Sequence, residues 1–210
     1  TSGGNYNTVV GDEAGTAITT GDENVAVGYS ALEDNTTATN GTAVGTYALR
    51  RNTTGANNTG IGRGALLFNT TGGYNVATGY RALYNNTTAS NNTAVGYDSL
   101  LTNTTGTENT SVGSVALDAN TTGDRNTAVG HESLGSNTTA DNNTGVGYGA
   151  LNANTTGTYL TAVGSGALEV SVTGSNSTAV GFESLKAAVS TSAAYGNTAI
   201  GKSSGYNITT

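Results

Sequence analysis

Small, apolar and polar residues recur in this chain with a period of 17 residues. The clearest mark is a glycine that follows a β-branched residue, and successive marks are 17 residues apart at Gly11, Gly28, Gly45, Gly62, Gly79, Gly96, Gly113, Gly130, Gly147, Gly164 and Gly181. We number the unit from its usual asparagine, so that Thr-Ala-Val takes positions 2 to 4, glycine position 5, Ala-Leu positions 8 and 9, and Asn-Thr-Thr positions 12 to 14. A fixed period of this kind indicates stacked repeats that share one core.

Positions 2 to 4 of each unit predict a short β-strand, because β-branched residues alternate there about a small one. Position 4 is Val or Ile in eleven of the twelve units, and we expect it in the core beside the leucine at position 9. The expected core therefore includes Val44, Leu49, Val95, Leu100, Val129, Leu134, Val163 and Leu168. The glycine at position 5 should supply a positive φ or allow a neighbouring backbone to come close.

A single unit buries too little apolar surface to offset the entropy of ordering it, so the units must stack. We predict an all-β fold, a parallel β-solenoid (β-roll) of about twelve 17-residue coils, in which equal positions lie above one another. The asparagines at position 12 should then form a ladder. For the segment around Ala-Leu, one short helical turn is the alternative.

The repeat covers nearly the whole chain as one domain. Residues 1–6 form a lead segment, residues 7–203 the β-solenoid repeat domain, and residues 204–210 the C-terminal tail of the last coil. Unit eleven contains three extra residues within KAAVSTSAAYG. Because the sequence has neither a starting Met nor a signal peptide, we expect a processed product or an excerpt.

Composition and charge narrow the possible functions. The 210 residues include 32 Gly and no Cys, Met, Trp or Pro, and the regular period argues against the disorder that this composition would otherwise suggest. A net charge of −7 disfavours binding to nucleic acid. No apolar run is long enough for membrane insertion.

Few residues are candidates for chemistry. His131, the only histidine, occupies a unit position that elsewhere holds Asp, Arg, Tyr or Lys, so we expect no catalytic site, no enzymatic activity and no cofactor. Asp12, Glu13, Asp22 and Glu23 cluster near the start of the repeat and could hold a calcium ion. A solvated acidic end explains them as well, so we predict no metal site.

The Asn-Thr-Thr triplets and the tyrosines each allow two interpretations. Each triplet is an acceptor sequence for N-glycosylation, at Asn35, Asn52, Asn69, Asn86, Asn103, Asn120, Asn137 and Asn154; a stacked turn ladder is the alternative that we favour. Tyrosines at position 6, namely Tyr29, Tyr80, Tyr97 and Tyr148, could contact a cell-surface glycan or a protein receptor, or could pack on neighbouring coils.

The units NTAVGYDSL and NTGVGYGALNANTTG resemble the low-complexity repeats of phage tail-fibre proteins. They are also similar to the YadA-like head repeats of trimeric autotransporter adhesins, although this unit is longer than the usual adhesin repeat. The resemblance extends from Asn7 to about Ser203. It implies a left-handed parallel β-roll, three chains side by side, and a role in surface attachment.

We therefore expect a structural fibre or filament segment that mediates attachment and lies outside the cell or on a virion surface. One alternative is an ice-binding β-solenoid, in which rows of threonine such as Thr104 and Thr105 would order water. Another is a glycosylated, self-assembling filament subunit.

We also expect a homo-oligomer, either a trimer or an axially stacked filament. Positions 3 and 8 hold only small residues in almost every unit, which either lets a second chain approach closely or fills a narrow coil. The apolar Val9, Val10 and Ile200 leave the two ends of the stack without polar caps.

Overall fold

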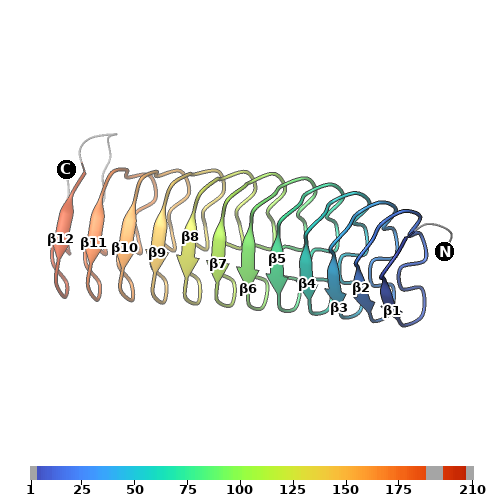
Figure 1. The fold of residues 1–210 in the computed structure, drawn as a ribbon. Coiled ribbons are helices and arrows are strands. Elements are labelled where there is room, and N and C mark those ends of the chain that lie inside the picture. Colours follow the sequence, from blue (N-terminus) through green and yellow to red (C-terminus); the bar gives the residue numbers. More distant parts are fainter. Residues whose placement is uncertain (1–3, 188–195, 207–210) are drawn as a thin grey trace.

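The computed structural model describes residues 4–187 and 196–206 as a rod of stacked coils, each of which contributes one short strand to a single sheet (Figure 1). The strands are β1 (Thr8–Val10), β2 (Val25–Val27), β3 (Thr42–Val44), β4 (Thr59–Ile61), β5 (Val76–Thr78), β6 (Thr93–Val95), β7 (Thr110–Val112), β8 (Thr127–Val129), β9 (Thr144–Val146), β10 (Thr161–Val163), β11 (Thr178–Val180) and β12 (Thr198–Ile200). Their order in the sheet follows the chain and every neighbouring pair is parallel. The predicted parallel β-solenoid is confirmed, and the segment around Ala-Leu forms turns, with no helix in the described residues.

Equal unit positions pair in register along the whole sheet. Thr93 lies opposite Thr110 in the β6–β7 pair, and Thr178 still pairs with Thr198 across the longer unit eleven. The extra segment of that unit includes residues 188–195, which lie outside the described residues. At the C-terminal tail, Ser204 closes the last coil by accepting the Leu185 N–H at 2.9 Å.

Backbone hydrogen bonds between coils continue beyond the strands. At position 9, the Leu49 N–H donates to the Ala65 carbonyl of the next coil at 2.9 Å. At position 7, the Tyr47 N–H donates to the Tyr29 carbonyl of the preceding coil, also at 2.9 Å. Each coil is thus bonded to both neighbours through its turns as well as through its strand.

The leucine at position 9 combines an unusual backbone conformation with complete burial. Leu100 has a φ of 53° and its side chain is fully buried, as are the leucines at the same position in other coils. A left-handed conformation costs such a residue roughly 1–2 kcal/mol. Burial of the side chain returns roughly 1.5–3 kcal/mol, so the packed interior holds each leucine in this conformation.

The structure corrects one part of the predicted core. The alanines at position 3, such as Ala43 and Ala94, are fully buried, while the residues at position 4 lie on the outer face of the sheet. The core assignment was therefore wrong for Val44 and Val163, which are 37% exposed, and for the half-buried Val95 and Val129. The predicted leucines Leu49, Leu100, Leu134 and Leu168 are buried.

The interior behind the strand is narrow, which explains this correction. A Cβ added at Gly60, a position-3 residue, would lie 3.2 Å from both Leu49 Cγ and the Ala65 carbonyl oxygen. An alanine fits this gap and a valine does not. The small residues at positions 3 and 8 therefore fill a narrow coil, and the interpretation that they meet a second chain was wrong.

Two rows of buried asparagines, at positions 1 and 12, form hydrogen bonds inside the coils and between them. At position 12, Asn103 donates to Asn86 Oδ1 of the neighbouring coil at 3.0 Å and to the Gly106 carbonyl of its own coil at 2.9 Å. At position 1, Asn92 donates to the same Gly106 carbonyl at 2.8 Å and accepts the Asn109 N–H at 2.9 Å. No buried side-chain nitrogen or oxygen in the described part of the chain lacks a partner.

These contacts contradict the glycosylation of the Asn-Thr-Thr triplets. A glycan needs an accessible amide nitrogen, yet the position-12 amides are fully buried in the folded coils, and that of Asn103 uses both hydrogens in the ladder. The acceptor assignment was therefore wrong for Asn35, Asn52, Asn69, Asn86, Asn103, Asn120, Asn137 and Asn154.

The glycine at position 5 meets both conditions expected of it. Gly96 has a φ of 140°, and a Cβ added there would lie 2.3 Å from the carbonyl oxygen of Gly113 in the next coil. Positive φ and close backbone approach thus occur at the same residue, which explains why every unit has glycine here.

We predict that Gly96→Ala lowers the free energy of unfolding by more than about 3 kcal/mol, because backbone strain of roughly 1–3 kcal/mol adds to the overlap with Gly113. The matched control is Gly149→Ala, since Gly149 also has a positive φ of 60° but its added Cβ has no neighbour closer than 4.0 Å. The control should cost only about 1 kcal/mol. Urea unfolding of both variants measures the difference, and equal losses would contradict the role of backbone overlap.

We predict that Asn103→Ala costs about 1–3 kcal/mol, because it removes the hydrogen bonds that Asn103 donates to Asn86 and Gly106 and takes away one of the two acceptors of the Asn120 amide. The control Thr105→Ala changes an exposed side chain in the same turn and should stay within about 0.5 kcal/mol. Thermal unfolding followed by circular dichroism compares them. An Asn103→Ala variant as stable as the control would refute a stabilising ladder.

Candidate functional site: an arginine and aromatic cluster

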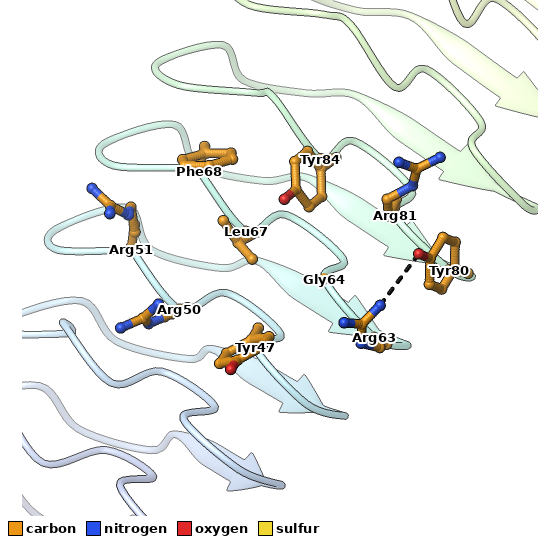
Figure 2. Close-up of a pocket in the computed structure, with 10 residues that line it drawn as sticks. All are labelled: Tyr47, Arg50, Arg51, Arg63, Gly64, Leu67, Phe68, Tyr80, Arg81 and Tyr84. Carbon is orange, nitrogen blue, oxygen red and sulfur yellow. Dashed lines mark hydrogen bonds between the residues drawn. The ribbon is translucent and has the colours of Figure 1, made fainter.

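A hollow of about 380 Å³ opens on the outer surface of the third to fifth coils (Figure 2). We call its lining the arginine–aromatic cluster, which consists of Tyr47, Arg50, Arg51, Arg63, Gly64, Leu67, Phe68, Tyr80, Arg81 and Tyr84. Leu67 lies at the centre of the view and is buried, so it forms an apolar floor. The volume falls within the range of ligand pockets, which is roughly 300–1,000 Å³.

The repeat brings these residues together from four unit positions on three successive coils. Position 6 contributes Arg63 and Tyr80, position 7 Tyr47, Gly64 and Arg81, position 10 Arg50, Leu67 and Tyr84, and position 11 Arg51 and Phe68. Parallel strands lie about 4.8 Å apart, so residues one or two units apart in the sequence become neighbours in space. The cluster therefore consists of variable side chains that the repeating backbone of three stacked coils places side by side.

Gly64 explains why this part of the surface is hollow. The flanking coils have Tyr47 and Arg81 at the same unit position, so the middle coil lacks a side chain where its neighbours have large ones. A Cβ added at Gly64 would lie 3.2 Å from the ring of Tyr84. The Tyr84 ring thus lies close to the bare backbone and forms one wall of the hollow.

Two of the four arginines are paired with carboxylates. Arg50 Nε lies 2.7 Å from Glu33 Oε2, and this guanidinium lowers the pKa of Glu33 through its hydrogen bond. Arg81 makes two hydrogen bonds to Asp98, of which the Nε to Oδ1 bond is 2.9 Å long, and the carboxylate raises the pKa of Arg81. Both guanidinium groups are therefore held in fixed positions beside the hollow.

Arg51 and Arg63 differ, because neither makes an ion pair with any residue that the structure describes. Both are exposed. The Arg51 guanidinium carbon lies 5.4 Å from the centre of the Phe68 ring, and that of Arg63 lies 5.7 Å from the Tyr80 ring. Arg63 also donates to the Tyr80 hydroxyl at 3.2 Å (Figure 2), so most of its donors face solvent.

The aromatic rings support one another. Phe68 and Tyr84 meet edge to face with their centres 5.1 Å apart. Tyr80 stacks on Tyr97 of the next coil at 5.4 Å with an interplanar angle of 9°. Such contacts hold rings in fixed orientations while part of each ring stays accessible.

The cluster also interrupts the acidic character of the chain. Residues 35–97 contain Arg50, Arg51, Arg63 and Arg81 and no Asp or Glu, whereas the rest of the chain contains all 14 acidic residues and three basic ones. Glu33 and Asp98, just outside this stretch, neutralise Arg50 and Arg81, so Arg51 and Arg63 supply the positive charge that attracts small anions to this place. This clustering could have been found from the sequence, since it needs only the positions of the charges.

A second hollow of about 420 Å³ continues from the first and shares Arg51 and Phe68 with it. Its other lining residues are Thr70, Asn85, Thr87, Thr102 and Thr104. The hydroxyl of Thr70 donates to the Thr87 carbonyl at 2.9 Å, and that of Thr87 to the Thr104 carbonyl at 3.1 Å. The hydroxyl hydrogens are thus engaged, while the oxygen lone pairs remain free to accept.

The tyrosines selected from the sequence pack on neighbouring coils, and their contact with a glycan or a protein receptor stays a prediction. Tyr29, Tyr97 and Tyr148 are more than 40% exposed. Tyr29 also packs edge to face against Tyr47 of the next coil at 5.4 Å. Of the four position-6 tyrosines, Tyr80 lines the hollow. The sequence did not point to Arg63, Phe68 and Tyr84, because the residue type at their unit positions varies from unit to unit.

The other candidate residues lie apart from the cluster. His131 stacks on Tyr148 at 5.5 Å and is exposed, and Glu13 accepts the Ser30 hydroxyl at 3.0 Å. The described residues contain no group of three or more His, Cys, Asp or Glu side chains able to hold a metal ion. They also contain no helix of the length and apolarity that crossing a membrane requires.

The outer face of the sheet is a second notable surface. It presents position 2, usually threonine, and position 4, usually valine, in register along all twelve strands. Val112 and Val163 on this face are more than a third exposed. The result is a continuous stripe of Thr and Val side chains, here called the Thr–Val stripe.

Comparisons of the chain with protein-family models, with curated proteins and with solved structures found no match.

Proposed function

We propose that this protein is a structural segment of an extracellular or virion-surface fibre or filament that mediates attachment. The observation that carries the proposal is the continuous backbone bonding of neighbouring coils through strand and turns, to which an asparagine ladder from Asn52 to Asn154 adds side-chain bonds. Such a stack transmits load along its axis without a large apolar core. The resemblance of its repeats to phage tail-fibre repeats and adhesin head repeats supports the same function.

The Thr–Val stripe supports association with further copies of this chain. Large exposed apolar surfaces commonly mark protein contacts, and this stripe extends along the whole sheet. A second copy offers the same side chains at the same spacing, so every coil of one copy can meet a coil of the other in register. Homo-oligomers are usually symmetric, and we propose a parallel homotrimer, with an axially stacked filament as the alternative.

We predict that the protein forms a trimer at micromolar concentration and that the double variant Val112→Lys/Val163→Lys is monomeric, because it places charges on the Thr–Val stripe. The matched control, Thr105→Lys/Thr156→Lys, adds the same charges at exposed turn positions and should stay trimeric. Size-exclusion chromatography with light scattering measures the mass, and circular dichroism checks folding. A folded, monomeric wild-type protein would sink both the trimer and the filament.

We predict that the native rod resists proteolysis, since its backbone is bonded between coils through the turns. Limited digestion should leave a large fragment intact under conditions that fully digest the heat-unfolded chain. Rapid cleavage of the native protein at many Asn-Thr-Thr turns would count against a rigid fibre.

Ice binding is a second candidate, and the Thr–Val stripe is the observation that favours it. Threonine occupies position 2 in ten of the twelve strands, which gives a regularly spaced row of side chains that are half-buried in all but the two end strands. The threonine rows at positions 13 and 14 suit this function less well, because the position-13 hydroxyls donate to neighbouring coils. A thermal-hysteresis measurement separates the candidates: clear activity that Val112→Lys/Val163→Lys abolishes would favour ice binding over the fibre.

A further inference from the structure

We propose that the arginine–aromatic cluster binds an acidic oligosaccharide, a sugar chain of a few units that bears carboxylate or sulfate groups. The inference names the ligand of the attachment surface and so rests on the proposed fibre function. Its basis is the combination of free guanidinium groups, aromatic rings and an apolar floor around one hollow of the third to fifth coils.

The negative charge of the ligand follows from Arg51 and Arg63. Both are exposed and free of carboxylate partners within the described structure, while Arg50 and Arg81 are engaged by Glu33 and Asp98. A guanidinium presents a planar fork of donors that matches a carboxylate or sulfate. The two free arginines lie on either side of the hollow (Figure 2), so they can hold two charged groups of one ligand.

The sugar character of the ligand follows from the rest of the lining. A sugar ring has apolar C–H faces and a rim of hydroxyls, so it needs flat apolar surface next to hydrogen-bond acceptors. Phe68, Tyr84 and Leu67 supply the apolar surface. In the adjoining hollow, Thr70 and Thr87 keep free oxygen lone pairs, since their hydroxyl hydrogens bond the next coil.

The length of the ligand follows from the arrangement of the two hollows. They share Arg51 and Phe68, so one chain of several sugar units can occupy both. Acidic residues bound the site along the rod, with Glu33 and Asp34 on the preceding coil and Asp98 on the following one. Beyond residues 35–97 the chain carries 14 acidic residues and only three basic ones, which repels a long polyanion and favours a short acidic glycan over a nucleic acid.

Isothermal titration calorimetry with the full chain tests the proposal. The probes are hexagalacturonic acid for carboxylate groups, a heparin-derived hexasaccharide for sulfate groups, maltohexaose as the neutral control, and a short oligothymidylate. We expect binding to one or both acidic sugars and none to maltohexaose, with affinity that falls as salt is added. Which acidic sugar binds more tightly identifies the charged group.

Three variants locate the site. Arg51→Gln/Arg63→Gln should weaken binding at least about tenfold, because it removes charge-assisted hydrogen bonds. Arg125→Gln is the matched control, since Arg125 is exposed on a distant coil and bonds Asn142, and it should change nothing. Gly64→Tyr fills the hollow without altering an arginine, and Tyr47 already occupies the equivalent position with a φ of 62°. It should abolish binding in a chain that circular dichroism shows to be folded, with the thermal midpoint lowered about as much as in Gly149→Ala.

Different results overturn the binding-site proposal and the fibre proposal. Absence of binding to both acidic sugars, equal loss in Arg125→Gln, or tighter binding of the oligothymidylate would overturn the acidic-oligosaccharide site, whatever the oligomeric state. A monomeric, protease-sensitive chain that still binds the acidic sugar through Arg51 and Arg63 would overturn the fibre and leave the site standing.

Discussion

The buried asparagine amides join the interiors of neighbouring coils through most of the rod, and the other features of the rod depend on them. Asn92 and Asn103 both donate to the Gly106 carbonyl, so one oxygen ties positions 1, 12 and 15 of a coil together. The same asparagines connect to the coils on either side. Because a polar interior tolerates no unmatched donor, a coil that slipped by one residue would lose several hydrogen bonds at once, which fixes the register.

This interior leaves part of each coil free to vary. Positions 1, 3, 5, 8, 9, 12 and 15 are buried or confined, whereas positions 6 and 11 reach the surface and positions 7 and 10 are buried in only some coils. The arginine–aromatic cluster is built entirely from these four variable positions. Stability and recognition therefore reside in different residues of the same unit, and a binding surface can be assembled without disturbing the ladders.

The sequence predicts the period, the parallel stack, the ladder and the role of the position-5 glycine, because all of these follow from strict repetition. It does not predict which face of the strand is buried. The alternation of Thr93, Ala94 and Val95 is compatible with either face of the strand being buried. Only the small space left by the leucines decides that Ala94 lies inside and Val95 outside. The hollow was missed for a related reason: Gly64 matters only beside Tyr47 and Arg81, which become its neighbours once the coils stack.

The interchangeability of the coils has an evolutionary consequence. Units of one length encoded in tandem are prone to unequal recombination, and a rod that gains or loses one of the regular coils keeps most interior contacts, since each new coil meets neighbours of the same kind. The reach of the rod can therefore change by single genetic events. The three adjacent coils that carry the arginine–aromatic cluster, with Gly64 in the middle one, can be retained together when other coils are gained or lost. Ligand preference can therefore be inherited independently of the length of the rod.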